Sequence, residues 1–336
     1  IRPPPIYTIF PYTTLFRSRK DRNATVDAFV TYDDRRIKWS RDLKADCGRG
    51  KYAEFSEDKI RHAVYRPFQQ RLLFYDPICN EEPRLFGQIF PSSLSELENK
   101  SIWLKIGSDW PYFALATAKI ADCLPQGGSQ CFPLYRYEGA DRRDNITDWA
   151  LDRFRTHYRN PQLRRKDIFH YIYAILHHPG YRQRFADDLK RDLPRIPLAP
   201  DFAAFAGAGE QLMELHLGYE TLDPYPLRFM ETPGVRLSCR VEEKMRFTRD
   251  RTALLVNPSL TLGGIPHQVF DYRLGNRSAL EWVIDQYRVD EDQRSGIRTD
   301  PNRPDDPEYI VRLVGQVVHV SLETLRIVAA LPRDFA

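Results

Sequence analysis

One stretch near the middle of the chain constrains the fold more than any other, because it predicts two helices joined at a sharp break. Apolar residues recur there at helical spacing, and they are Ile168, Phe169, Ile172, Tyr173, Ile175 and Leu176. Pro179 and Gly180 end this helix, and a second amphipathic run then carries Tyr181, Phe185 and Leu189. The pattern predicts a packed helical hairpin.

Short strands are expected before this hairpin, and further helices on either side of it. The strand-like runs between about 37 and 137 cover 72–75, 101–106 and 132–137, and Pro, Gly, Ser and Asp separate them. Helices are expected over 147–155 and 201–217. The second of these helices can begin at Pro200 or Asp201 and end at Gly218.

After about residue 235 the pattern changes again. Strands are expected over 241–247 and 252–262, and helices over 278–287 and 307–317, with Ser321 as a cap of the last helix. Strands and helices in separate blocks are typical of α+β domains. The sequence therefore predicts an α+β fold with a sheet-rich part, a helical hairpin region and an α/β C-terminal part.

The first 18 residues differ from everything that follows them. Residues 9–18 look like a translated sequencing-adapter peptide, and the prolines at 3–5 show no foldable pattern, so we exclude residues 1–18 from the fold. A signal peptide is the alternative, but Pro11 interrupts the short apolar run and no small-residue cleavage site follows. We expect the native sequence upstream of about residue 19 to be missing.

Composition limits the class of protein. The 336 residues are 42% hydrophobic and 29% charged, as in ordinary globular proteins of one large or two smaller domains. No run of about 18 apolar residues occurs, so we expect no membrane span. Five widely spaced cysteines argue against a disulfide framework and a structural zinc site, and they indicate a reducing cytoplasm.

Arginine dominates the basic residues, with 39 Arg and 11 Lys against 46 acidic side chains and a net charge of +4. A guanidinium donates two parallel hydrogen bonds to phosphate or to the guanine edge, which an ammonium cannot match. A GC-rich genome would produce the same bias. The charge therefore permits nucleic-acid binding without requiring it.

Two catalytic patterns can be weighed. An adenine methyltransferase needs a glycine-rich loop and an Asn/Asp-Pro-Pro-aromatic motif for the flipped base, but the nearest match, at 257–260, lacks the aromatic. Asp223, Glu242 and Lys244 could form a Mg²⁺-dependent nuclease site, although the pattern is loose and Asp223 lies in a proline-rich turn. We predict no catalytic residue in this chain.

Three histidines lie on or near the first helix of the hairpin. His177 and His178 are adjacent and point to different faces, while His170 and His177 lack the spacing that places two zinc ligands one turn apart. Packing, or capping of the helix C-terminus, explains them better. We predict no metal ligand among them.

Eight short segments between about 37 and 332 carry a family resemblance. They are YRPFQQR (65–71), CFPLY (131–135), the helical hairpin, LHLGYE (215–220), VEEKM (241–245), RSALEW (277–282), SGI with DPN (295–297 and 300–302), and VSLET (320–324). In this order they resemble the C-terminal specificity domain of type ISP restriction-modification enzymes. Gln69 departs from a frequent Asp, and Gly275-Asn276 reverses a frequent Asn-Gly.

The resemblance implies a function. Type ISP enzymes join nuclease, translocase, adenine methyltransferase and target-recognition parts, so it implies double-stranded DNA and an upstream methyltransferase domain as partners. It implies S-adenosylmethionine, ATP and Mg²⁺ for the full-length enzyme and no cofactor for this fragment. Residues 19–145 would form the junction with the methyltransferase, and 146–336 the target-recognition domain. A structural coupling module with non-specific DNA contacts is the alternative, ahead of the Mg²⁺ nuclease.

Loop-borne cations, amides and hydroxyls are the expected DNA contacts, because these groups bond to phosphates and base edges. They are Arg66, Arg71, Lys190, Arg195, Lys244, Arg246, Asn276, Arg277, Ser278, Arg294, Arg298 and Asn302. Structural alternatives exist: Arg66 or Arg71 as a buried arginine paired with Asp76, Lys190 and Arg195 as helix-end charges, Lys244 and Arg246 as a solvated strand face, and Ser278 as an N-cap.

The best candidates for sequence reading are the segments 276–278 and 294–302. The first opens a helix whose N-terminal amides suit a phosphate or a groove edge. The second is a polar loop in which Gly296 permits close backbone approach.

Overall fold

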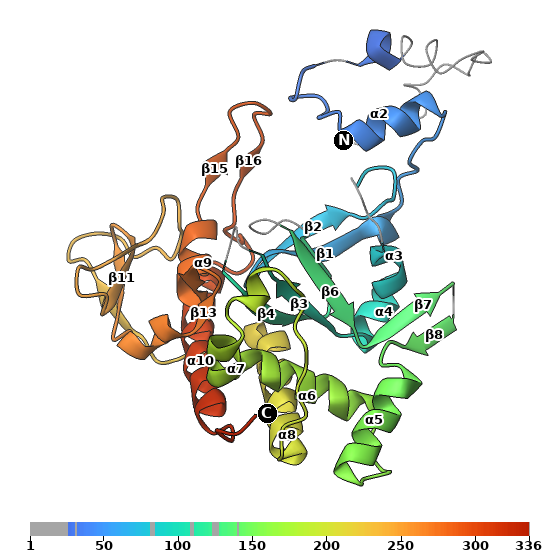
Figure 1. The fold of residues 1–336 in the computed structure, drawn as a ribbon. Coiled ribbons are helices and arrows are strands. Elements are labelled where there is room, and N and C mark those ends of the chain that lie inside the picture. The colour runs from blue at the N-terminus through green and yellow to red at the C-terminus, as the bar shows by residue number, and fades with distance from the viewer. Residues whose placement is uncertain are drawn as a thin grey trace. The chain divides into compact units, whose positions relative to one another are not determined.

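The computed structural model describes residues 26–30, 32–80, 85–107, 111–122, 128–139 and 141–335 (Figure 1). The segment 1–18, predicted to be non-native, lies outside these residues. The described chain forms two compact units. The smaller unit holds the residues up to 62 with 71–87 and 290–299, and the larger unit holds 63–70, 88–289 and 300–336. The domain boundary at 145/146 stays a prediction.

In the smaller unit, α2 (Arg41–Gly48) begins after Ser40, whose hydroxyl accepts a hydrogen bond from the Leu43 amide at 3.2 Å. A 3-10 turn (Glu57–Lys59) leads into β1 (Ile60–Arg66), and β1 and β2 (Gln69–Phe74) run from one unit into the other. Lys59 pairs with Asp76 at 2.8 Å, and Arg66 pairs with Asp122 in place of Asp76. β15 (Asp290–Glu291) and β16 (Arg298–Thr299) form an antiparallel hairpin.

β3 (Ser101–Lys105) is the central strand of an antiparallel sheet in the larger unit, between β4 (Phe113–Thr117) and β6 (Ser129–Pro133). Every residue of β3 and β4 is buried. The strand predicted over 132–137 is two strands, because the chain bends at Leu134 and β7 (Tyr135–Glu138) pairs with β8 (Asp141–Asp144).

Three short elements complete this region. β5 (Ile120–Ala121) pairs in parallel with β1, through Ala63 and Val64. The helices α3 (Phe86–Ile89) and α4 (Ser93–Glu98) precede β3, and α4 begins with a reciprocal cap between Ser92 and Ser95.

The predicted helical hairpin is present as α6 (Arg165–His177) and α7 (Pro179–Arg184). His178 joins the two helices: it ends α6, and its ring Nδ1 accepts a hydrogen bond from the Tyr181 amide at 3.2 Å. The second helix is shorter than predicted, and Leu189 lies in a separate 3-10 turn (Asp188–Lys190). Packing and capping are the roles that the structure shows for His178.

α5 (Asp148–Tyr158) covers the helix predicted over 147–155, and α8 (Phe202–Leu217) begins after Asp201 and ends at Gly218, as predicted. α8 packs against α6, and Gly209 permits their close approach. A Cβ at that position would lie 1.8 Å from the carbonyl oxygen of His170. Only glycine, which has no Cβ, therefore fits at the point where α8 approaches α6.

A small antiparallel sheet follows, in the order β10 (Arg246–Phe247), β11 (Ala253–Asn257), β12 (Leu260–Gly263), β9 (Arg228–Glu231). The strand predicted over 241–247 is wrong for most of its length, since only its last two residues pair and Val241 instead bonds to the Asn302 side chain. The strand predicted over 252–262 is a hairpin of two strands, turned by Asn257, whose side-chain oxygen accepts from the Leu260 amide at 3.0 Å.

β13 (Arg273–Leu274) and β14 (Arg277–Ser278) form a tight hairpin that leads into α9 (Ala279–Gln286), so the helix predicted over 278–287 is confirmed. The last helix, α10 (Tyr309–Ala329), continues far beyond the predicted end at 317. Ser321 lies inside it, buried, and donates a hydrogen bond to the Val317 carbonyl at 2.7 Å. The predicted cap at Ser321 is therefore wrong.

Two hydrophobic clusters fill the larger unit. The first lies among β11, β12, α9 and α10 and includes Leu254, Trp282 and Val317; the second surrounds α6 and α8 and includes Tyr171. α10 contributes to both, since Ile327 belongs to the second. Among the described residues, each helix is too short or too polar to span a lipid bilayer.

A buried polar network, here termed the histidine network, connects the two clusters. His216 on α8 is 2% exposed, and its Nδ1 lies 2.6 Å from the Tyr173 hydroxyl. Its Nε2 lies 2.8 Å from the Thr324 hydroxyl and 3.2 Å from the Tyr272 hydroxyl. The Tyr173 hydroxyl also accepts from the Ala116 amide at 2.8 Å. One histidine thus ties α6, α10 and the segment before β13 to α8.

Candidate functional site

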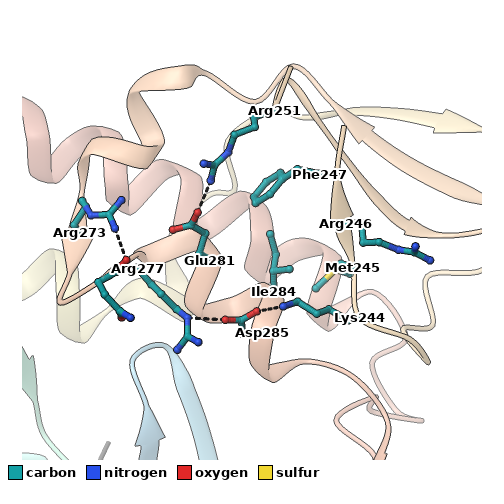
Figure 2. Close-up of a pocket in the computed structure, with 11 residues that line it drawn as sticks. Lys244, Met245, Arg246, Phe247, Arg251, Arg273, Arg277, Glu281, Ile284 and Asp285 are labelled. Carbon is teal, nitrogen blue, oxygen red and sulfur yellow. Dashed lines mark hydrogen bonds and ion pairs between the residues drawn. The ribbon is translucent and has the colours of Figure 1, made fainter. Parts of the chain in front are cut away.

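A cationic pocket, here termed the basic pocket, opens between β10, the β13–β14 hairpin and α9 in the larger unit (Figure 2). Its volume is about 680 Å³. It is lined by Lys244, Met245, Arg246, Phe247, Arg251, Arg273, Asn276, Arg277, Glu281, Ile284 and Asp285. Cations outnumber carboxylates by five to two, so the pocket favours an anionic ligand.

Asp285 organises one side of this pocket. Its carboxylate, 18% exposed, forms ion pairs with Lys244 and with the Nε of Arg277, the latter at 2.7 Å. Figure 2 shows the two cations reaching Asp285 from opposite sides. The Arg277 guanidinium also lies over the Trp282 ring, 5.0 Å from its centroid. Trp282 is in turn fixed by a hydrogen bond from its indole nitrogen to the Leu274 carbonyl at 3.0 Å.

Arg251 and Glu281 organise the other side. The Arg251 guanidinium pairs with Glu281 and lies over the ring of Phe270, 3.8 Å from its centroid. Burial raises the pKa of Glu281, but hydrogen bonds from Ser278 and Arg251 outweigh it and leave the pKa below its ordinary value. Glu281 therefore remains a carboxylate, and it holds Arg251 in place.

Three amides at the start of α9 already have hydrogen-bond partners. The Ser278 amide donates to the Glu281 carboxylate at 2.8 Å, the Glu281 amide donates to the Ser278 hydroxyl at 3.2 Å, and the Ala279 amide donates to the Tyr272 carbonyl at 3.1 Å. Ser278 is fully buried. A carboxylate thus occupies the helix end at which the sequence suggested a phosphate, and Ser278 has the structural role of an N-cap.

Lys244, Arg246, Asn276 and Arg277 are the predicted contacts that the basic pocket brings together. Asn276 is exposed at the turn of the β13–β14 hairpin, where Gly275 has a φ of +71°. That backbone conformation favours glycine, so the reversed Gly-Asn order keeps the asparagine at the tip of the turn.

Other predicted contacts in the larger unit do not line the basic pocket. Arg66 pairs with Asp122, and its guanidinium lies 3.9 Å from the ring centroid of Tyr65. Lys190 forms an exposed pair with Asp187 at 2.7 Å. Arg195 is exposed and borders a separate cavity of about 280 Å³.

Asn302 has a structural role in the larger unit. Its side chain accepts a hydrogen bond from the Val241 amide at 2.8 Å and donates to the Val241 carbonyl at 2.7 Å. It fastens the segment before α10 to the segment before β10, which carries Lys244.

Three predicted contacts lie in the smaller unit. Arg71 is half-buried on β2. Arg294 and Arg298 are exposed on the β15–β16 hairpin. The loop of this hairpin is held by Asp292, whose carboxylate accepts from the amides of Arg294 at 3.1 Å and Ser295 at 2.8 Å.

The residues of the nuclease pattern take other partners. Glu242 pairs with Arg240 at 2.8 Å, Lys244 pairs with Asp285, and the Asp223 carbonyl bonds to His319 at 2.7 Å. Within the part of the chain that the structure describes, no three His, Cys, Asp or Glu side chains are grouped as metal ligands.

Sequence reasoning missed Arg273, Glu281 and Asp285 in the basic pocket. Glu281 could have been found, because Ser278 followed by Glu three residues later is the spacing of a capping box. Arg273 faces Ser278 across the hairpin, which the Gly275-Asn276 turn could have indicated. Asp285 meets Lys244 only through tertiary packing, and no local pattern reveals that.

Comparisons with known proteins show the family to which this chain belongs. The model of the Type ISP C-terminal specificity domain family matches residues 12–313. Three solved structures are similar: a nuclease-deletion mutant of the Type ISP restriction-modification enzyme LlaGI in complex with a DNA substrate mimic, the DrdV–DNA complex, and the ATP-dependent Type ISP restriction-modification enzyme LlaBIII bound to DNA. No match was found among curated proteins.

These structures are similar over nearly the whole of this chain. The sequence identities are 34%, 34% and 26% in the same order, with TM-scores of 0.81, 0.83 and 0.81 over 93%, 92% and 94% of the chain. The chain spans only 28%, 32% and 21% of those longer proteins.

Proposed function

We propose that this chain, which belongs to the Type ISP C-terminal specificity domain family, binds double-stranded DNA and recognises a target sequence in it. The similar structures support the proposal, because all three hold DNA or a DNA mimic. Recognition of a DNA site is also the role that the family's description as a specificity domain suggests for this part of those longer proteins.

The basic pocket is the observation that carries the proposal. Its cations come from three separate elements, and they stay partly exposed: the side chains of Lys244, Arg246 and Arg277 are 49%, 77% and 32% exposed. Exposed Lys and Arg bind phosphates and set the register of a protein on the duplex, while Arg and Asn can bond to base edges. The pocket offers both kinds of group within one surface.

The other activities belong, in this proposal, to the longer enzyme. We assign adenine methylation with S-adenosylmethionine, and ATP-dependent cleavage with Mg²⁺, to regions other than this chain, with a methyltransferase domain as its neighbour. The described residues do not fit a Mg²⁺ site, since none of their His, Cys, Asp and Glu side chains are grouped as ligands.

A selection experiment tests the proposal. The full chain is incubated with a randomised duplex pool at near-physiological salt, and the retained DNA is sequenced. We expect enrichment of one short asymmetric site. Retention without any enriched sequence would favour the coupling module, and no retention even at low salt would contradict DNA binding altogether.

Arg246→Ala provides a sharper test of the basic pocket. Arg246 is 77% exposed and only loosely paired with Glu243 at 3.7 Å, so we expect its loss to weaken binding about equally for all sequences. The slope of log K against log salt should fall by about 0.9, as for one lost phosphate contact. The control is Arg326→Ala on α10, an arginine that is 64% exposed, is paired with Glu323 and lies outside the pocket. Equal effects of the two variants would contradict a phosphate role for Arg246.

A further inference from the structure

We propose that Arg277 reads a guanine in the target and that Asp285 is its positioning residue; this inference rests on the DNA recognition proposed above. A bidentate contact to guanine needs two parallel N–H groups, which donate to O6 and N7 in the major groove. It also needs the guanidinium plane to be held before binding, because ordering a flexible arginine costs free energy.

Arg277 meets both requirements. Its Nε lies 2.7 Å from the Asp285 carboxylate in an ion pair, and its guanidinium carbon lies 5.0 Å from the centroid of the Trp282 ring, so two independent contacts hold the guanidinium. Among the described residues, neither of its terminal nitrogens has a hydrogen-bond partner, and the side chain is 32% exposed. The two N–H groups needed for guanine therefore remain available at the surface.

The other arginines of the basic pocket lack this combination. Arg251 already uses the terminal nitrogen Nη2 for Glu281, and its Nε is buried without a hydrogen-bond partner in the described chain. Arg273 uses Nη2 for the Asn276 carbonyl. Arg246 has no ring beneath it among the described residues, and it is 77% exposed. Arg277 is thus the arginine of the basic pocket that contacts with Asp285 and Trp282 hold in place while its terminal nitrogens keep their hydrogen-bonding capacity.

Asp285 also influences which hydrogen-bond acceptor Arg277 would bind, a phosphate or a base. Its carboxylate partly neutralises the charge of Arg277 and so weakens the attraction of this guanidinium for a phosphate, whereas the O6 and N7 atoms of guanine are neutral acceptors. Because Asp285 holds Lys244 through its other oxygen, it fixes the spacing between Arg277 and a second cation. A single carboxylate thereby directs Arg277 toward a base and leaves Lys244 for the backbone.

The selection experiment with three variants tests this inference. Arg277→Lys keeps the charge and removes the fork, so we expect the preference for guanine to fall roughly tenfold or more at one position of the site and to stay unchanged elsewhere. Asp285→Asn keeps the shape and releases Arg277, so the same position should relax while affinity for random duplex rises. Arg326→Lys, at an exposed arginine of α10 that does not line the pocket, is the control and should leave the preference at every position unchanged. Thermal unfolding of each variant checks that it folds.

The outcomes separate this inference from the proposed function. If Arg277→Lys retains the guanine preference, or weakens every position equally, the assignment to Arg277 is overturned while recognition by the chain stands. If that variant does not fold, Asp285→Asn decides, and an unchanged preference overturns the assignment. A wild-type chain that enriches no sequence would refute the proposed function itself, and this inference with it.

Discussion

The basic pocket and the histidine network are both polar clusters assembled from distant parts of the chain, yet they are built in opposite ways. The pocket keeps formal charges at the surface, where its cations outnumber its carboxylates. The network is neutral and enclosed: burial, with the nearby Arg182 charge, lowers the pKa of His216 to about 3. Both ring nitrogens of His216 have a partner, whereas the two terminal nitrogens of Arg277 have no hydrogen-bond partner among the described residues.

The difference shows how a polar group can stabilise a fold or bind a ligand. Enclosed groups add stability when they are uncharged and their hydrogen bonds are satisfied, because an unpaired group in a low dielectric is costly. Exposed groups bind when their hydrogen-bonding capacity is only partly used. His216 belongs to the first kind and Arg277 to the second.

The largest expected effect comes from breaking the network. His216→Ala leaves the hydroxyls of Tyr173, Thr324 and Tyr272 without their shared partner and creates a cavity, so the free energy of unfolding should fall by about 3 kcal/mol or more. Urea unfolding followed by circular dichroism measures it. His267→Ala, at an exposed histidine, is the control and should change stability by less than about 0.5 kcal/mol. Similar losses in both variants would contradict the role given to His216.

Lowering the pH should reduce the stability of the fold, because its buried histidines are held in the neutral form. Burial lowers the pKa of His216 to about 3 and that of His170 to about 4, below the ordinary 6.5, so the unfolded chain binds more protons across this window. Stability should therefore be full above pH 6.5 and fall as the pH drops toward 4, by about 1.4 kcal/mol per pH unit for each histidine. Urea midpoints measured between pH 7 and 4 test this. A stability that is constant across that range would show that these histidines are not held neutral by the fold.

A smaller effect is expected at the edge of the basic pocket. Ser278→Ala removes the N-cap of α9 and should lower the free energy of unfolding by about 1 kcal/mol. Because Ser278 is fully buried, the sequence preference in the selection experiment should not change. The adjacent Arg277→Lys should show the reverse, with a changed preference and a small stability effect. A changed preference in Ser278→Ala without loss of stability would indicate that the Ser278 hydroxyl contacts DNA, and it would contradict a purely structural role for this residue.

Local signals in the sequence were sufficient for several elements. The α+β class, the helical hairpin, the ends of α8 and the position of α9 followed from apolar spacing, caps and breakers within a few residues. The errors arose where tertiary contacts override such signals. Ser321 looked like a cap because its hydroxyl can bond locally, but the apolar face of α10 continues past it and buries it.

The candidate site was predictable in part for the same reason. Lys244, Arg246, Asn276 and Arg277 were identified by residue type, and the structure places them around one pocket. Their grouping depends on the packing of β10 beside α9, which joins positions about 30 residues apart and which no short pattern encodes. Asp285 was missed because its importance lies entirely in the two cations that it joins.

α10 stabilises the fold from a position away from the basic pocket. The helix is anchored in both hydrophobic clusters, and none of its side chains lines the basic pocket. The scaffold beneath the pocket is therefore maintained by residues that do not line it. Under the proposed function, exchange of a few surface cations would alter the recognised site while the interior stayed the same, so specificity could diverge much faster than the fold.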